Sequence, residues 1–80
     1  MFVIYAIYSD SHDKIYIGYS SDLEGRLFAH NHPSNKGWTA KYKPWRIIYS
    51  EPAESKSEAL IREKQLKSYQ GRLFIRRLLS

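Results

Sequence analysis

The sequence contains no cysteine, which excludes a disulfide scaffold, a zinc ribbon and a thiol nucleophile. Its longest apolar run, residues 1–8, is far shorter than the ~20 residues that span a bilayer, and no signal-peptide pattern accompanies it. We therefore expect a cytoplasmic protein with no membrane partner. Acidic residues are scarce, because 8 Asp and Glu stand against 13 Lys and Arg. The net charge of +5 predicts an anionic partner.

The composition favours one folded domain. A chain of 80 residues can support one hydrophobic core but not two, so we expect residues 1–80 to form a single domain. Hydrophobic residues make up 42% of the chain and aromatic residues 15%, which argues against disorder.

The first twenty residues predict a β-hairpin. Residues 2–8 (FVIYAIY) are apolar on both alternating faces, as in a central strand that is covered on both sides. Residues 9–13 have the composition of a turn, and residues 14–19 (KIYIGY) predict a second strand. In that strand Tyr16 and Gly18 share one face, opposite the face of the isoleucines.

A helix is expected after the hairpin. Ser21 and Glu24 have the spacing of a capping box, with Ser21 as N-cap, which predicts a helix over residues 22–31. Arg26 and His30 lie four residues apart and therefore share one stripe of this helix.

The rest of the chain predicts one more strand and two more helices. Residues 33–44 read as a loop, and residues 45–51 as a strand. A second capping box, formed by Ser55 and Glu58, opens a helix that runs through residue 67. Gly71 is expected to separate it from a short final helix over residues 72–79. The order ββαβαα predicts an α+β fold, in which a three-stranded sheet is packed with helices.

Positive charge is concentrated in two segments. Residues 36–46 contain four basic residues, no acidic residue and three aromatic residues, and residues 62–80 contain six basic residues and one acidic residue. Cations interleaved with aromatic rings suit phosphate neutralisation with stacking against bases. The alternative is that Trp38 and Trp45 belong to the core and that the lysines form an ordinary solvated rim.

Glu63 is the unusual residue of the second helix. It falls between Ala59, Leu60 and Leu66 on the stripe that should face the sheet, where an unpaired carboxylate is costly to bury. One interpretation is a structural ion pair with Arg26 or another base. The other is a functional carboxylate, which Glu63 alone does not establish.

Tyr5 and Tyr16 lie on adjacent strands of the hairpin and can meet across it. Two buried tyrosines are ordinarily packing residues whose hydroxyl groups bond to a neighbour. The three histidines lack the spacing of a zinc site, and no serine triad, Walker loop or dinucleotide-binding motif is present.

Taken together, these residues resemble the GIY-YIG nuclease family. The resemblance rests on the triplet Val3-Ile4-Tyr5, ten intervening residues, the triplet Tyr16-Ile17-Gly18, and then Arg26 and Glu63 in the two predicted helices. It covers nearly the whole chain in order. The chain is most similar to small standalone bacterial members that resemble the N-terminal catalytic domain of the nucleotide-excision-repair nuclease subunit.

The resemblance implies a three-stranded antiparallel sheet flanked by helices and metal-dependent hydrolysis of phosphodiester bonds. It makes Tyr16 the general base or relay for the attacking water, while Tyr5 positions that water. Arg26 would hold the scissile phosphate, and Glu63 would be the only protein ligand of one Mg²⁺ or Mn²⁺ ion. His30 would be a second proton carrier or a phosphate contact. The expected substrate is DNA, in processing of the repair or recombination type.

Further contacts to nucleic acid are expected from the two basic segments and from the end of the hairpin. Val3 and Tyr19 depart from the family pattern, because Val3 replaces a glycine and Tyr19 stands where the repair subunits have lysine. The candidate contacts are Tyr19, Lys36, Lys41, Lys43, Arg46, Lys67 and Arg72.

Two other functions are compatible with the sequence. One is a nucleic-acid-binding module whose nuclease activity is lost or negligible, and the other is a small interaction domain with a basic surface. No second domain that would select a target is recognisable, which leaves room for a partner protein or a homodimer in targeting.

Overall fold

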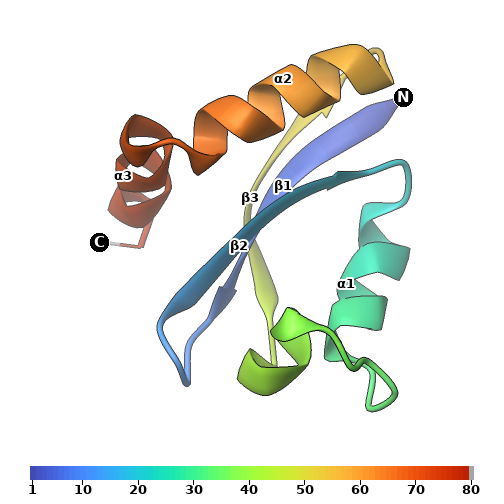
Figure 1. Cartoon of the computed structure of the whole chain (residues 1–80), viewed down its shortest axis with the longest axis vertical. Helices are drawn as coiled ribbons and strands as arrows, with labels where there is room; N and C mark the ends of the chain where they lie inside the picture. The colour runs from blue at the N-terminus through green and yellow to red at the C-terminus, as the bar shows by residue number, and fades with distance from the viewer. Residues whose placement is uncertain (80) are drawn as a thin grey trace.

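Three antiparallel strands form the centre of the molecule in the computed structural model, which describes residues 1–79 (Figure 1). Strand β1 (Phe2–Ser9) lies between β2 (Lys14–Ser20) and β3 (Arg46–Ala53), and both pairings are antiparallel. The predicted central strand and hairpin are thereby confirmed. The physical reason is the one expected from the sequence: β1 is apolar on both faces because both faces are covered.

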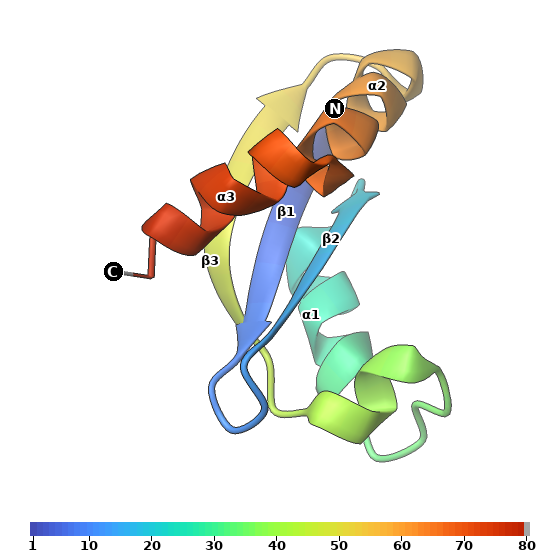
Figure 2. The same cartoon turned by 60° about the vertical axis from the view of Figure 1, so that its left-hand side comes forward.

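The helices lie on both sides of the sheet. Figures 1 and 2 show α2 and α3 over one face, and α1 with the short 3₁₀ helix η1 over the other. These arrangements confirm the α+β class and the order ββαβαα, with η1 as an additional turn inside the segment predicted to be a loop. The bounds are α1 (Leu23–Asn31), η1 (Trp38–Tyr42), α2 (Lys56–Lys67) and α3 (Tyr69–Arg77). Over residues 1–79, the helices are too short or too polar to cross a bilayer.

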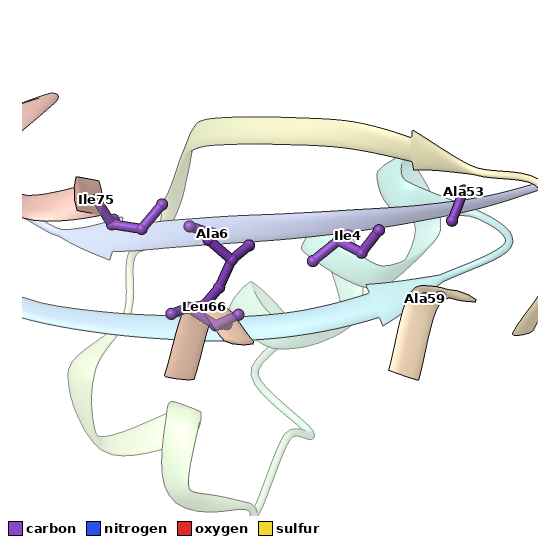
Figure 3. Packing of buried hydrophobic residues seen from close by; sticks show 7 residues of the cluster. Ile4, Ala6, Ala53, Ala59, Leu66 and Ile75 are labelled. Carbon is purple, nitrogen blue, oxygen red and sulfur yellow. The ribbon is translucent and has the colours of Figure 1, made fainter. Parts of the chain in front are cut away.

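Alternating residues of β1 divide the core into two clusters. The face toward α2 and α3 carries an aliphatic cluster, shown in Figure 3, that contains Ile4, Ala6, Ile17, Ala53, Ala59, Leu66 and Ile75. The opposite face is aromatic and contains Tyr5, Ile7 and Trp45, with Leu23 and Leu27 of α1 packed against it. Tyr5, the one tyrosine that is fully buried in the described residues, therefore has its hydroxyl group on the α1 side of β1.

The start of α1 differs by one residue from the prediction. The N-cap is Asp22 and not Ser21, because a carboxylate oxygen of Asp22 accepts a hydrogen bond of 3.1 Å from the backbone N–H of Gly25. The hydroxyl group of Ser20 in turn accepts the backbone N–H of Asp22 at 2.9 Å. A carboxylate cap also interacts favourably with the helix dipole, which a serine hydroxyl does only weakly. The one-residue shift leaves Arg26 in the second turn of α1.

The predicted start of α2 is confirmed. The Ser55 hydroxyl group accepts the N–H of Glu58 at 3.2 Å, and the Glu58 carboxylate accepts the N–H of Glu54 at 3.1 Å. Since both ends of this capping arrangement are satisfied, the start of α2 is well defined.

The expectation for Gly71 is wrong. The break between α2 and α3 lies at Ser68, whose hydroxyl group caps α3 by accepting the N–H of Gly71 at 3.2 Å. Gly71 itself lies in the first turn of α3. A β-carbon at this position would overlap the backbone of Gln65 and Leu66 at the end of α2. Glycine is needed here because the two helices approach closely, and not because the chain must turn.

Candidate active site

A cleft of about 450 Å³ lies where the ends of β1 and β2 meet α1 and α2. It brings together four of the five residues predicted to be catalytic, which are separated by up to 58 positions in the chain. The cleft is lined by Phe2, Tyr5, Tyr16, Gly18, Tyr19, Ser20, Ser21, Arg26, Lys56 and Glu63. The fifth predicted residue, His30, does not line the cleft and lies behind Tyr5.

The two tyrosines lie side by side on the sheet. Tyr5 of β1 pairs in register with Gly18 of β2, and the ring centroids of Tyr5 and Tyr16 are 6.4 Å apart. A β-carbon on Gly18 would lie 2.8 Å from the Tyr5 hydroxyl oxygen and 3.1 Å from the ring of Tyr16. The glycine of the second triplet therefore provides the space that the Tyr5 hydroxyl group occupies. The only signal for this role in the sequence is the place of Gly18 in the second triplet.

Arg26 places a positive charge in the cleft, which Lys56 of α2 also lines. The Arg26 side chain is exposed and projects from α1. Leu23 and Leu27 of the same helix pack against the aromatic face of the sheet. Burial raises the pKa of Tyr5, and the nearby Arg26 guanidinium group opposes this effect. The Tyr5 hydroxyl group is therefore protonated at neutral pH.

Glu63 reaches the cleft from the middle of α2. Its side chain is 17% exposed, and its ion-pair partner in the described part of the chain is Lys67, 3.6 Å away and one turn further along α2. Ala59 and Leu66 bury the face of α2 next to it, as predicted, but Leu60 is 43% exposed and does not belong to that stripe. The carboxylate thus lies at the edge of the buried face and not within it.

The donor groups of the cleft fit one hard divalent cation. Glu63 is the only carboxylate that lines it. Residues 1–79 contain no group of three or more His, Cys, Asp or Glu side chains that could hold a metal ion. Mg²⁺ is commonly bound by one or two carboxylates with water and substrate phosphate completing its shell, whereas zinc sites in proteins use three or four side chains. The arrangement therefore suits Mg²⁺ or Mn²⁺ and does not suit zinc.

His30 lies beneath the two tyrosines. Its side chain is buried, its Nε2 is 3.0 Å from the Tyr5 hydroxyl oxygen, and its ring centroid is 4.9 Å from that of Tyr16. Its Nδ1 is 3.0 Å from the hydroxyl oxygen of Thr39 in η1. Burial lowers the pKa of His30, and the charge of Arg26 lowers it further. The imidazole is therefore neutral at pH 7, and its neighbour toward the cleft is Tyr5.

The predicted contacts near the cleft and α3 are distributed over two depressions. Tyr19 lines the cleft itself, and Lys67 lies at its edge as the partner of Glu63. Arg72 lines a second depression of about 400 Å³ along β2, together with Lys14. Cationic side chains therefore follow β2 away from the cleft.

The predicted contacts in residues 36–46 are spread over the surface beside η1. Lys36 and Lys41 are exposed. Lys43 donates a hydrogen bond of 3.3 Å to the backbone carbonyl of His32, and Arg46 forms an ion pair of 2.7 Å with Asp10. The cleft contains none of these four side chains.

The two tryptophans of this segment have different roles. Trp45 is 3% exposed and packs in the aromatic cluster, where its indole N–H donates to the backbone carbonyl of Thr39 at 2.9 Å. Trp38 is 48% exposed, and its ring centroid lies 6.3 Å from that of Tyr16. The core interpretation therefore holds for Trp45, while Trp38 offers an aromatic surface next to the cleft.

Comparison with known proteins agrees with this geometry. The family model described as the GIY-YIG catalytic domain matches residues 1–74. The chain belongs to the GIY-YIG family. It is 36% identical to a UPF0213 protein of Staphylococcus saprophyticus over 56 residues, and this alignment covers 70% of this chain and 68% of the relative. It is 37% identical to a UPF0213 protein of Staphylococcus aureus over 59 residues, and this alignment covers 74% of this chain and 72% of the relative. No solved structure matches the chain.

Family membership defines the class of chemistry. GIY-YIG domains are nuclease domains and are generally dependent on divalent metal ions, so the substrate class is nucleic acid. The two triplets of the GIY-YIG motif lie on β1 and β2, and their tyrosines share the α1 face of the sheet. The predicted family and fold are thus confirmed.

Proposed function

We propose that this chain is a divalent-metal-dependent endonuclease that hydrolyses phosphodiester bonds in DNA. The observation that carries the proposal is the convergence of Tyr5, Tyr16, Arg26 and Glu63 on one cleft from four different elements. A protein that only binds nucleic acid has no need to hold a carboxylate opposite two tyrosines, because a carboxylate repels phosphate.

Each of these side chains has one role in the proposed reaction. Tyr16 accepts the proton of the attacking water as it passes its own hydroxyl proton to solvent, so that it acts as a general base through a relay, and Tyr5 holds that water in position through its hydroxyl group. Arg26 binds the scissile phosphate and stabilises the negative charge that develops on it. The pentacoordinate phosphate gains most from Arg26 because a guanidinium group matches two phosphate oxygens at once.

Glu63 is the residue that would hold the metal ion. A bound divalent ion would polarise the phosphate and lower the pKa of a coordinated water molecule. Lys67 competes for the same carboxylate, since its ammonium group lies 3.6 Å away. An ion held by Glu63 would therefore bind in competition with Lys67, whose side chain is 46% exposed and has room to move away.

One cleft makes one cut. A break in both strands of a duplex therefore requires two successive nicks or a homodimer. A partner protein could select the target. The reaction suits DNA processing in repair or recombination.

The proposal is tested by a cleavage assay on supercoiled, linear, branched and single-stranded DNA and on RNA, with Mg²⁺, Mn²⁺ or EDTA. We expect metal-dependent cutting that falls by at least about 100-fold in Tyr16→Phe, Arg26→Ala and Glu63→Gln. Glu54→Gln, which neutralises an exposed carboxylate outside the cleft, is the matched control and should retain full activity. Circular dichroism verifies the fold of each variant.

Binding is measured in parallel by fluorescence anisotropy. Glu63→Gln should still bind DNA, because the basic segments are unchanged. A wild-type protein that binds DNA but cuts none of the substrates would contradict the proposal and favour a nucleic-acid-binding module.

A further inference from the structure

A chain of hydrogen bonds leads from the loop before η1 to the hydroxyl group of Tyr5. The Asn35 amide nitrogen lies 2.8 Å from the Thr39 hydroxyl oxygen, which lies 3.0 Å from Nδ1 of His30. Nε2 of His30 lies 3.0 Å from the Tyr5 hydroxyl oxygen. Thr39 and His30 are 6% and 8% exposed, so water has little access to the inner members of this chain. Neither Asn35 nor Thr39 is among the residues that line the cleft.

The direction of these bonds follows from the groups that can only donate. The backbone N–H of Gly37 donates to the Asn35 side-chain oxygen at 2.9 Å, which fixes the orientation of the amide. The Asn35 nitrogen then donates both of its hydrogens, one to the backbone carbonyl of His30 at 2.9 Å and one to the Thr39 hydroxyl oxygen.

Thr39 passes this direction on to the imidazole. Its hydroxyl oxygen accepts from Asn35, so its single hydrogen is available for Nδ1 of His30. An imidazole that accepts at Nδ1 and is neutral carries its proton on Nε2. The lowered pKa of His30 agrees with a neutral ring. With the proton on Nε2, His30 is the donor to the Tyr5 oxygen.

We propose that Thr39 and Asn35 are positioning residues of this site: they hold His30 in the Nε2–H form, so that His30 donates a hydrogen bond to Tyr5. This inference rests on the proposed nuclease function. Because the Tyr5 oxygen accepts from His30, the hydrogen of Tyr5 is directed to the cleft, where it donates to the attacking water or to a phosphate oxygen. His30 thus acts through Tyr5 and does not carry a proton to or from the substrate.

The 3₁₀ helix η1, which holds Thr39, is itself anchored. Trp45 donates to the Thr39 backbone carbonyl at 2.9 Å, and its own backbone N–H donates to the side-chain oxygen of Asn31 at 2.6 Å. Asn31 is the last residue of α1, and His30 precedes it. The two residues that must meet, His30 and Thr39, are therefore fixed on elements that are tied to each other through Trp45.

The protonated nitrogen of His30 is measured directly by NMR on protein labelled with ¹⁵N-histidine, with His30 assigned from the His30→Gln spectrum. In the wild type at neutral pH we expect Nε2 in the chemical-shift range of a protonated ring nitrogen and Nδ1 in the range of an unprotonated one. Thr39→Val removes the hydroxyl group at nearly constant volume, so it should abolish this preference, and Thr39→Ser should retain it. Ser34→Ala is the control, because the Ser34 hydroxyl group bonds to His32 and not to His30.

The kinetic test uses a fluorescein-labelled oligonucleotide with Mg²⁺. Thr39→Val should lower kcat by about tenfold with little change in KM, and Thr39→Ser should recover at least half of the loss. A proton on Nδ1 of wild-type His30 would overturn the inference, and so would a Thr39→Ser variant as impaired as Thr39→Val.

The NMR result is independent of activity. If the wild type cuts no substrate but His30 carries its proton on Nε2 only when a hydroxyl group is present at position 39, the nuclease proposal fails and the positioning network stands. If the wild type is active and the proton is on Nδ1, the nuclease proposal stands and the positioning role fails.

Discussion

Replacing Gly18 with alanine tests whether the Tyr5 hydroxyl group must occupy its present position. The new β-carbon would lie 2.8 Å from the Tyr5 oxygen and 3.0 Å from the ring carbon that bears it. Ordinary contacts of this kind are longer by roughly half an ångström, so Tyr5 has to move by about that distance. Tyr5 is 1% exposed and its ring packs in the aromatic cluster, so the movement strains this cluster or lengthens the hydrogen bond to His30.

The expected effects on stability and activity differ in size. Overpacking in a filled core costs about 1–3 kcal/mol, so the midpoint of urea denaturation should fall accordingly. Displacement of a positioning hydroxyl group by a fraction of an ångström lowers kcat by roughly 10- to 100-fold. Activity should therefore fall in protein that is still folded, which distinguishes misplacement of Tyr5 from loss of the native state.

Activity is measured below the thermal transition of each variant, beside urea denaturation followed by circular dichroism. Ser34→Ala is the control, because Ser34 is exposed, lies outside the cleft and hydrogen-bonds to His32. It should stay within about 1 kcal/mol of the wild type and retain activity. A Gly18→Ala protein with wild-type kcat would refute the argument that the glycine makes room for the Tyr5 hydroxyl group.

Three further outcomes are expected. Gly71→Ala should lower the free energy of unfolding by about 3 kcal/mol in urea denaturation, because its β-carbon meets helix backbone that has no room to move, while kcat of the folded protein is unchanged. Burial and a nearby cation lower the pKa of His30, so below about pH 6.5 the unfolded chain binds more protons than the folded one. The free energy of unfolding should therefore decline as the pH falls from this value toward the pKa of His30 in the folded protein. This decline should be absent in His30→Gln. Lys67→Met removes the competitor of Glu63 and should lower the half-saturating Mn²⁺ concentration by about two- to fivefold in calorimetric titration, and an unchanged value would show that the 3.6 Å ion pair does not oppose metal binding.

The fold could be predicted from the sequence because its pattern is dictated by burial. Ile4 and Ala6 point to one side of β1 and Tyr5 and Ile7 to the other, and all four are apolar or aromatic, which only a doubly covered strand requires. The start of α2 was equally predictable, since Ser55 caps it through a local bond. Signals of this kind depend on residues that are close in sequence.

The local errors have a common cause. Two good caps stood next to each other at Ser21 and Asp22, and the choice between them depends on how Ser20 leaves the sheet. Gly71 looked like a helix terminator, but its role is set by backbone from the preceding helix. In both cases a contact that the local pattern does not encode decided the outcome.

Some residues of the candidate site could likewise be predicted from the local sequence pattern, and others could not. Glu63 could be singled out because a carboxylate beside a buried stripe conflicts with the pattern around it. Thr39 and Asn35 carry no such conflict, because polar residues are ordinary in a segment that reads as a loop. Only the fold brings them to His30, and the cations and tryptophans around them were the more conspicuous feature of that segment.

Tyr5 belongs both to the core and to the cleft, and this determines how the site has to be tested. Its ring packs with Ile7 and Trp45, whereas its hydroxyl group is held by His30 and lines the cleft. Substitution of the whole side chain would remove packing and chemistry together and lower stability by about 3–5 kcal/mol. Tyr5→Phe keeps the ring but leaves the buried N–H of His30 without an acceptor, at a cost of about 1–3 kcal/mol. Variants of Gly18 and Thr39, which move or reorient the hydroxyl group without deleting it, therefore separate the function of Tyr5 from its contribution to the fold.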